Sequence, residues 1–275
     1  MLRMGWGFLF LMSIAQSAQE PAQLIPYKQV KEESLDLHVF YPENYNPDQM
    51  HTGIVIFHGG GWAAGEPESV YGFARRYAEM GYVAICVEYR LYRDKTVSVS
   101  TCVEDARSAL RFVRLHANEL GVSSNHIVAL GYSAGGHLAI ATAVFDRFDD
   151  PEEDITISCR PNAIVLYSAV LDTSVNGYGY VRVEKQWKEL SPRHNIHSGL
   201  PPIVIFHGTE DQTVPYRSVQ QFEAEAQEQG NECVLITLEG EGHNTLLNDK
   251  DVMNFVMEST AGFLSQHRFT PVISQ

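Results

Sequence analysis

The sequence has few of the features that mark metal proteins or disulfide-stabilised domains. Its 275 residues contain four cysteines, Cys86, Cys102, Cys159 and Cys233, and no two of them form a CxxC pair. Zinc sites depend on closely spaced cysteine and histidine ligands, so we expect no metal ion. The sequence does not decide whether Cys86 and Cys102 form a disulfide, although Cys86 and Cys233 lie in apolar runs typical of buried thiols.

Positive charge is also scarce. Twenty Lys and Arg face 34 Asp and Glu, which gives a formal net charge of −14, and no run of basic residues occurs. This balance disfavours nucleic acid and anionic membranes as partners. After the N-terminal segment no apolar run is long enough for a transmembrane helix, and we find neither repeats nor low-complexity linkers.

Residues 1–18 have the layout of a secretory signal peptide. Arg3 precedes an apolar run at Trp6–Ile14, and small residues follow at Ala15–Ala18, where we expect cleavage. The alternative is a short N-terminal anchor helix, but the run is too short to span a bilayer comfortably. We therefore expect a secreted or periplasmic protein that leaves the membrane once the signal is removed.

The rest of the chain alternates between predicted strands and helices. Apolar runs without a polar face are typical of strands buried in a parallel sheet. The predicted strands lie at 27–41, 53–58, 82–91, 127–131, 163–170, 201–208 and 233–240, and the predicted helices at 69–81, 100–121, 137–145, 214–230 and 249–267. This order predicts one α/β domain over 19–275, with a mostly parallel central sheet flanked by helices on both faces. An irregular stretch at about 172–198 suggests a small lid.

One short stretch, GYSAGGH at Gly131–His137, carries the strongest chemical signal. A predicted strand precedes it and a predicted helix follows, which is the setting in which G-x-S-x-G forms a nucleophile elbow. The small residues around Ser133 allow the backbone to approach closely. The alternative is an ordinary serine in a glycine-rich turn; we take Ser133 as the candidate nucleophile.

A nucleophilic serine needs a base, and the base needs an acid that fixes its tautomer. The carboxyl ends of parallel strands meet at one edge of a sheet, so residues that follow such strands are candidates. His243 and Asp211 follow the last two predicted strands and fit these roles. Other carboxylates compete for the acid role: Glu210, Asp172 and Asp249.

Four motifs together resemble a known family. HGGGW begins at His58, GYSAGGHLA at Gly131, HGTEDQTVP at His207 and GEGH at Gly240. With these motifs the chain resembles α/β-hydrolases of the esterase/lipase type, in particular bacterial acetyl/feruloyl esterases and hormone-sensitive-lipase-like carboxylesterases. The resemblance covers about residues 30–266, includes the family's chain order of serine, acid and histidine, and implies a serine carboxylesterase without a cofactor.

An oxyanion hole is the remaining part of such a site. The amide that follows the nucleophile belongs to Ala134, and the resemblance implies that Gly60 and Gly61 supply the other donors. A plain glycine-rich turn is the alternative. A phosphate-binding loop is disfavoured because no GK[ST] follows the glycines.

The substrate is less well defined by the sequence. Only a short strand-like stretch precedes Gly53 after the signal, so we expect no helical cap of the kind that hormone-sensitive-lipase-like enzymes carry, which favours the acetyl/feruloyl-esterase group. Such enzymes remove short or aromatic acyl groups from carbohydrate. Trp62 and Trp187 are candidate substrate contacts, with packing of the lid and core as the alternative.

Three other functions stay open: an arylformamidase-type amide hydrolase, a serine peptidase, and a non-catalytic binding protein with the hydrolase fold. The sequence does not indicate an oligomeric state.

Overall fold

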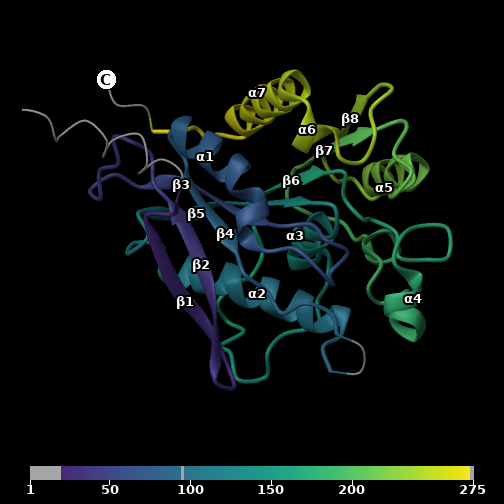
Figure 1. The fold of residues 1–275 in the computed structure, drawn as a ribbon, viewed down its shortest axis with the longest axis horizontal. Coiled ribbons are helices and arrows are strands. Elements are labelled where there is room, and N and C mark those ends of the chain that lie inside the picture. The colour runs from purple at the N-terminus through teal and green to yellow at the C-terminus, as the bar shows by residue number, and fades with distance from the viewer. Residues whose placement is uncertain (1–19, 94–95, 273–275) are drawn as a thin grey trace, which may run out of the picture.

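The structure is a computed structural model that describes residues 20–93 and 96–272. An eight-stranded sheet runs through its centre in the order β1-β2-β4-β3-β5-β6-β7-β8 (Figure 1). The pairs β1/β2 and β2/β4 are antiparallel, and every later pair is parallel. The strands are β1 (Gln23–Val30), β2 (Glu33–Phe40), β3 (His51–Phe57), β4 (Val83–Val87), β5 (Val122–Tyr132), β6 (Ala163–Tyr167), β7 (Ile203–Gly208) and β8 (Cys233–Leu238).

Helices cover both faces of this sheet. On one face α1 (Tyr71–Glu79) and α7 (Lys250–Gln266) pack over one apolar cluster, and they lie along the same side of the molecule in Figure 1. On the other face a second cluster joins α2 (Val99–Leu115), α3 (Ala134–Val144) and α5 (Tyr216–Glu228). The predicted mostly parallel sheet with helices on both faces is confirmed.

The sequence pattern of the strands follows from this layering. Every residue of β3, β4, β6 and β7 is buried, because helices cover both faces of these strands. At the sheet edge, β8 is buried only at its two ends. Continuous apolar runs in the sequence therefore mark the interior strands, whose carboxyl ends position the candidate site.

Two predicted elements differ most from the structure, and smaller differences occur at strand ends, such as the start of β5 at Val122 and the end of β4 at Val87. The stretch predicted as one strand over 27–41 forms the hairpin β1–β2, because Lys31 adopts a left-handed φ of 55° that reverses the chain. The predicted helix over 100–121 ends at Leu115, and turns follow in which the Val122 amide donates to the Ala117 carbonyl. Neither difference moves a candidate site residue.

All four cysteines are buried and free, so the Cys86–Cys102 bridge left open by the sequence does not form. Burial raises the pKa of the Cys102 thiol to about 12. Within the described ranges, no group of three or more His, Cys, Asp or Glu side chains is arranged to hold a metal ion. The helices in those ranges also include none that is long and apolar enough to cross a bilayer. The predicted signal peptide lies outside the described residues.

Candidate active site

Ser133 occupies a sharp turn between β5 and α3. Its backbone has φ 55° and ψ −119°, a conformation that a residue with a side chain adopts only under constraint. Two hydrogen bonds impose it: the Ser133 amide donates to the Tyr167 carbonyl at 2.9 Å, and the Val170 amide donates to the Ser133 carbonyl at 3.1 Å. The turn projects the hydroxyl beyond the end of β5, as the predicted nucleophile elbow requires.

The glycines of GYSAGG permit this turn because the backbone of β3 lies very close. A Cβ atom on Gly135 would lie 2.1 Å from the carbonyl oxygen of Phe57. That distance is far below any van der Waals contact, so α3 and β3 would have to separate to admit a methyl group.

We therefore expect Gly135→Ala to lower the free energy of unfolding by about 1–3 kcal/mol or more. Urea denaturation followed by circular dichroism measures the change. Gly262→Ala in α7 is the matched control, because no atom lies within 4 Å of a Cβ atom at that position. The control should be stabilised by about 0.5–1 kcal/mol. Equal stability of the two variants would contradict the close approach at Gly135.

The structure brings together the three side chains that the sequence predicts as nucleophile, base and acid. His243 Nε2 lies 2.9 Å from Ser133 Oγ, and His243 Nδ1 lies 2.7 Å from Asp211 Oδ2. The residues come from the loops that follow β5, β7 and β8. These loops meet because the three strands are parallel and end at one edge of the sheet.

The charge of Asp211 favours proton transfer from Ser133 to His243. Burial alone would raise the pKa of Asp211, but hydrogen bonds from His207, His243 and the Val214 amide hold it well below the usual range. Asp211 Oδ1 accepts from the amides of Thr213 and Val214, each at 2.8 Å. An ionised Asp211 accepts a hydrogen bond from the Nδ1–H of His243, which leaves Nε2 free to accept the proton of Ser133.

His207 is a further neighbour of this site, to which the sequence patterns assigned no role. Its imidazole is fully buried, and Nε2 lies 2.9 Å from the Val214 carbonyl and 3.1 Å from Asp211 Oδ2. The HGTED motif could have indicated this contact between His207 and Asp211. His207 is the penultimate residue of β7, and Asp211 comes four positions later in the turn that follows.

The competing carboxylates have other partners. Asp172 pairs with Arg193 at 3.2 Å and accepts the Ser174 amide at 2.7 Å. Asp249 accepts the amides of the first residues of α7 and so caps that helix. The side chain of Glu210 points to solvent, since the residue is exposed. Asp211 is therefore the acid that reaches the histidine.

The HGGG loop presents unpaired amides next to the elbow. Gly60 has φ 112°, and a Cβ atom there would lie 1.9 Å from the Ala64 carbonyl oxygen. The amides of Gly60, Gly61 and Ala134 donate to no acceptor among the described residues, and Ala134 is the first residue of α3, where helical amides lack internal partners. Three free donors are thus available for a developing oxyanion.

His58 braces this loop. Its ring stacks on Tyr89 with centroids 4.2 Å apart, and its Nδ1 lies 2.7 Å from the Gly59 carbonyl. Burial lowers the pKa of His58 to about 4, so the ring is neutral at physiological pH. A neutral, stacked imidazole supports the loop without adding charge beside the candidate oxyanion hole.

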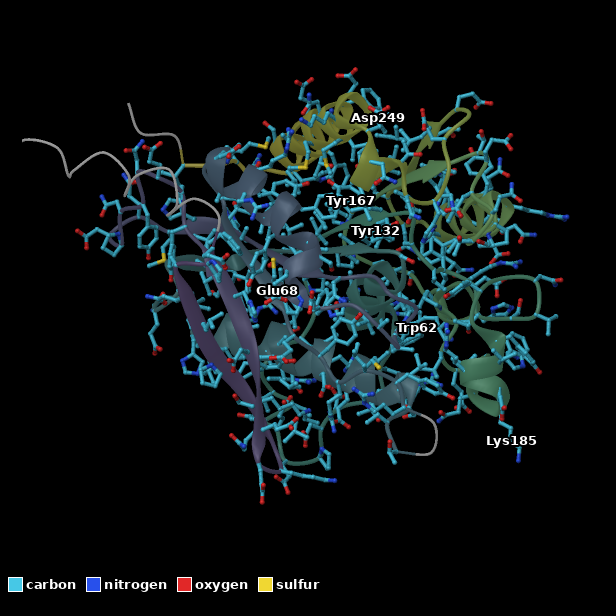
Figure 2. All side chains as sticks on the ribbon, in the orientation of Figure 1. Trp62, Glu68, Tyr132, Tyr167, Lys185 and Asp249 are labelled. Carbon is cyan, nitrogen blue, oxygen red and sulfur yellow. The ribbon has the colours of Figure 1, made fainter. Side chains whose placement is uncertain are left out.

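Trp62 follows the alternative that the sequence left open, packing between core and lid. Its side chain is completely buried, and its Nε1 donates to His137 Nδ1 at 3.3 Å. A Cβ atom on Gly179 would lie 2.4 Å from the indole, so the start of the lid rests directly on it. Figure 2 places Trp62 between the sheet and the lid, with Lys185 at the outer edge of the molecule.

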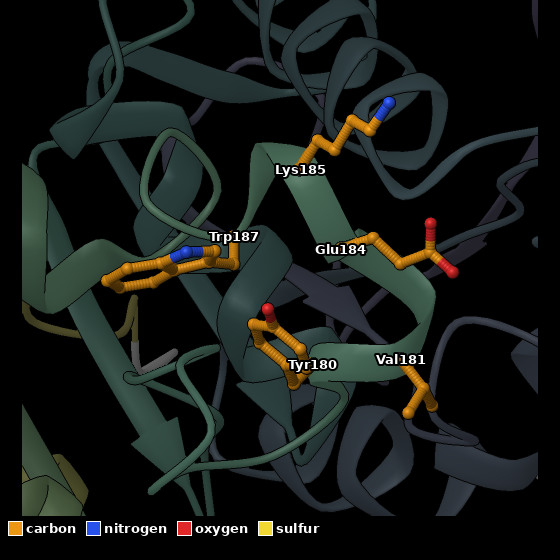
Figure 3. A pocket seen from close by; sticks show the side chains of 5 residues that line it. All are labelled: Tyr180, Val181, Glu184, Lys185 and Trp187. Carbon is orange, nitrogen blue, oxygen red and sulfur yellow. The ribbon is translucent and has the colours of Figure 1, made fainter.

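The irregular segment at 172–198 contains only short elements: α4 (Tyr180–Val183) and two 3₁₀ turns at Glu184–Gln186 and Pro192–Asn195. Half-buried Trp187 lines an open hollow of about 420 Å³. Figure 3 shows its indole next to the ring of Tyr180, with Val181 and Glu184 on the opposite side. The hollow is formed by the lid alone, so a substrate contact of Trp187 stays a prediction.

Known proteins are similar to this chain in both sequence and structure. The BD-FAE family model matches residues 37–175, half of the chain. The chain belongs to the BD-FAE family. It is 38% identical to Thermogutta terrifontis esterase 2, solved after phosphoramylation by tabun, with a TM-score of 0.86 over 91% of this chain and 96% of that one.

Curated relatives are longer than this chain. A probable isoprenylcysteine alpha-carbonyl methylesterase of Arabidopsis thaliana is 26% identical over 76% of this chain and 48% of its own length. Endo-1,4-beta-xylanase B of Butyrivibrio fibrisolvens is 25% identical over 65% of this chain and 30% of its own length. The chain thus spans about half or less of these two relatives. The similarities and the site geometry agree that it carries a serine carboxylesterase domain of the α/β-hydrolase fold.

Proposed function

We propose that the protein hydrolyses carboxylic esters through an acyl-enzyme on Ser133. The observation that carries this proposal is the continuous hydrogen-bonded chain from Ser133 through His243 to Asp211, beside three unpaired amides. A binding protein would need neither feature, whereas the amide hydrolase and the peptidase would use both and are separated from the esterase by their substrates.

The reaction follows from the proton path. As Ser133 Oγ bonds to the ester carbonyl carbon, His243 Nε2 takes its proton, and the displaced electron pair forms an oxyanion held by the amides of Gly60, Gly61 and Ala134. Collapse of this intermediate breaks the ester C–O bond, and His243 gives its proton to the departing alcohol. Water, deprotonated by His243, then attacks the acyl carbon; the bond to Ser133 Oγ breaks, His243 returns the proton to Oγ, and the acid is released.

The proposed substrates are esters of short-chain or aromatic acids, such as acetylated or feruloylated carbohydrate. The lid consists only of short elements, which leaves no long apolar cover for a fatty acyl chain. Solved structures of the similar T. terrifontis esterase bind propionate and butyrate. The aromatic side chains of Tyr180 and Trp187 in the open hollow suit a sugar or aryl ring.

The proposed location is secreted or periplasmic. It rests on the basic, apolar and small-residue order of residues 1–18. An acidic surface, with a net charge of −14, further favours small or carbohydrate esters over nucleic acid as partners.

An ester panel tests the function. The purified protein should hydrolyse p-nitrophenyl acetate and butyrate with a higher kcat/KM than the octanoate, and should release acid from acetyl xylan or methyl ferulate. A fluorophosphonate probe should label Ser133. Activity confined to N-formyl aryl amides or to peptides would favour the amidase or peptidase, and absence of labelling would favour a binding protein.

A further inference from the structure

A guanidinium group lies directly over the candidate oxyanion loop. A Cβ atom on Gly61 would lie 2.8 Å from Arg182 Nη1 and 2.7 Å from the hydroxyl oxygen of Tyr178. The two groups touch each other, since Arg182 Nη1 donates to Tyr178 Oη at 3.2 Å. Both side chains come from the lid and are half-buried.

Arg182 has no carboxylate partner in the described part of the chain. Several arginines that lie partly within the fold are paired with acids: Arg90 with Asp105, Arg107 and Arg111 with Asp149, and Arg193 with Asp172 and Glu225. Arg114 and Arg160 instead donate to backbone carbonyl groups, which Arg182 does not reach within the described ranges. Arg182 therefore lies beside the candidate site without a neutralising carboxylate, in a chain with 14 more acidic than basic residues.

The backbone around Arg182 is fixed on both sides. Val183 is 5% exposed and packs into the core, while the Arg182 amide donates to the Gly179 carbonyl at 2.8 Å. Gly179 itself rests against the buried Trp62, with φ 80°. These contacts hold the guanidinium beside Gly61, and among the residues that the structure describes only one of its five N–H donors has an acceptor.

We propose that Arg182 and Tyr178 bind a carboxylate carried by the substrate close to its scissile ester bond. A guanidinium offers two parallel N–H donors that match a carboxylate, and the Tyr178 hydroxyl adds a third. Because both groups lie against Gly61, a donor of the candidate oxyanion hole, a carboxylate bound there belongs to the acyl group or the alcohol of the same ester. The inference rests on the proposed esterase function and specifies its substrate class as acidic esters.

Two pairs of esters, matched in shape but not in charge, test the proposal. Monomethyl succinate and methyl succinamate differ by a carboxylate on the acyl side, and 4-acetoxybenzoate and 4-acetoxybenzamide by one on the alcohol side. In at least one pair the wild-type protein should hydrolyse the carboxylate member with a kcat/KM at least about tenfold higher, mainly through a lower KM. The pair that shows the preference identifies the side on which the carboxylate binds.

Arg182→Gln should abolish this preference while changing the neutral esters less than about threefold. Arg182→Lys, which keeps the charge but not the paired donors, should retain part of it. Lys250→Gln is the charge-matched control: Lys250 is exposed at the start of α7, so its loss alters the net charge equally and should leave the preference intact. Added salt should weaken the preference of the wild-type protein.

Two outcomes overturn the proposal in distinguishable ways. If Arg182→Gln lowers the activity on neutral and acidic esters by the same factor, or the wild type shows no preference, Arg182 only supports the oxyanion loop and the esterase function stands. If the wild type hydrolyses none of the four esters, the proposed function fails and the inference fails with it.

Discussion

Replacement of Ser133 by alanine should lower kcat for p-nitrophenyl acetate by at least about 10⁴-fold. Without the hydroxyl no acyl-enzyme forms, and only the unpaired amides of the oxyanion loop remain to accelerate direct attack by water. The variant should fold normally, because the turn is held by backbone hydrogen bonds that alanine also makes. Steady-state kinetics with active-site titration of the wild type measures the loss.

Ser265→Ala provides the matched control for this substitution. Ser265 is exposed on α7, so the same loss of a hydroxyl should leave kcat within about twofold. Fluorophosphonate labelling should disappear in Ser133→Ala and persist in Ser265→Ala. Ester hydrolysis at the wild-type rate by Ser133→Ala would remove Ser133 from the mechanism.

Asp211→Asn should lower kcat by about 10⁴-fold. The oxygen of the new amide would continue to accept the backbone amides of Thr213 and Val214, which leaves its NH₂ group facing His243 Nδ1. A donor in this position requires an unprotonated Nδ1 and therefore places the proton of the neutral imidazole on Nε2. The histidine then donates to Ser133 instead of accepting its proton.

Asp172→Asn separates this effect from the general cost of losing a buried charge. Asp172 is as buried as Asp211 but pairs with Arg193, away from the histidine. Its variant should be less stable to urea, yet the folded protein should keep kcat within about tenfold. A larger loss in Asp172→Asn than in Asp211→Asn would reassign the acid.

Because the pKa of Asp211 is lowered, Asp211→Asn should also change how the free energy of unfolding depends on pH in the acidic range. An unfolded aspartate has a pKa of about 3.9, above that of folded Asp211, so the ionised group stabilises the folded state above this pH and loses that contribution as the pH falls toward the folded value. The wild type should therefore lose more unfolding free energy than the variant between about pH 5 and pH 3. Urea titrations at each pH measure the difference.

The main layers of the fold and the reacting triad were predictable because both depend on short-range patterns. Buried parallel strands require unbroken apolar runs, and reactive side chains such as Asp211 and His243 follow directly after them. The β1–β2 hairpin was not predicted, since its turn uses Lys31 in a left-handed conformation and contains no glycine or proline.

The parts that were missed depend on contacts between distant segments. The burial of Trp62 is set by the lid, which returns more than a hundred residues later to cover it. The position of Arg182 beside Gly61 follows from the same return of the chain, and no pattern around residue 182 indicates it. Sequence patterns therefore identify the reactive residues that follow the strands. The residues that surround the substrate depend on how distant loops pack against the site.

The four cysteines have a consequence for how the protein reaches its native state. Each thiol is enclosed in the core and none is joined to another, so the native state requires no oxidation step, unlike that of small exported domains that depend on disulfides. In an oxidising compartment the four thiols must be buried before they pair with one another, so rapid packing of the core protects this native state.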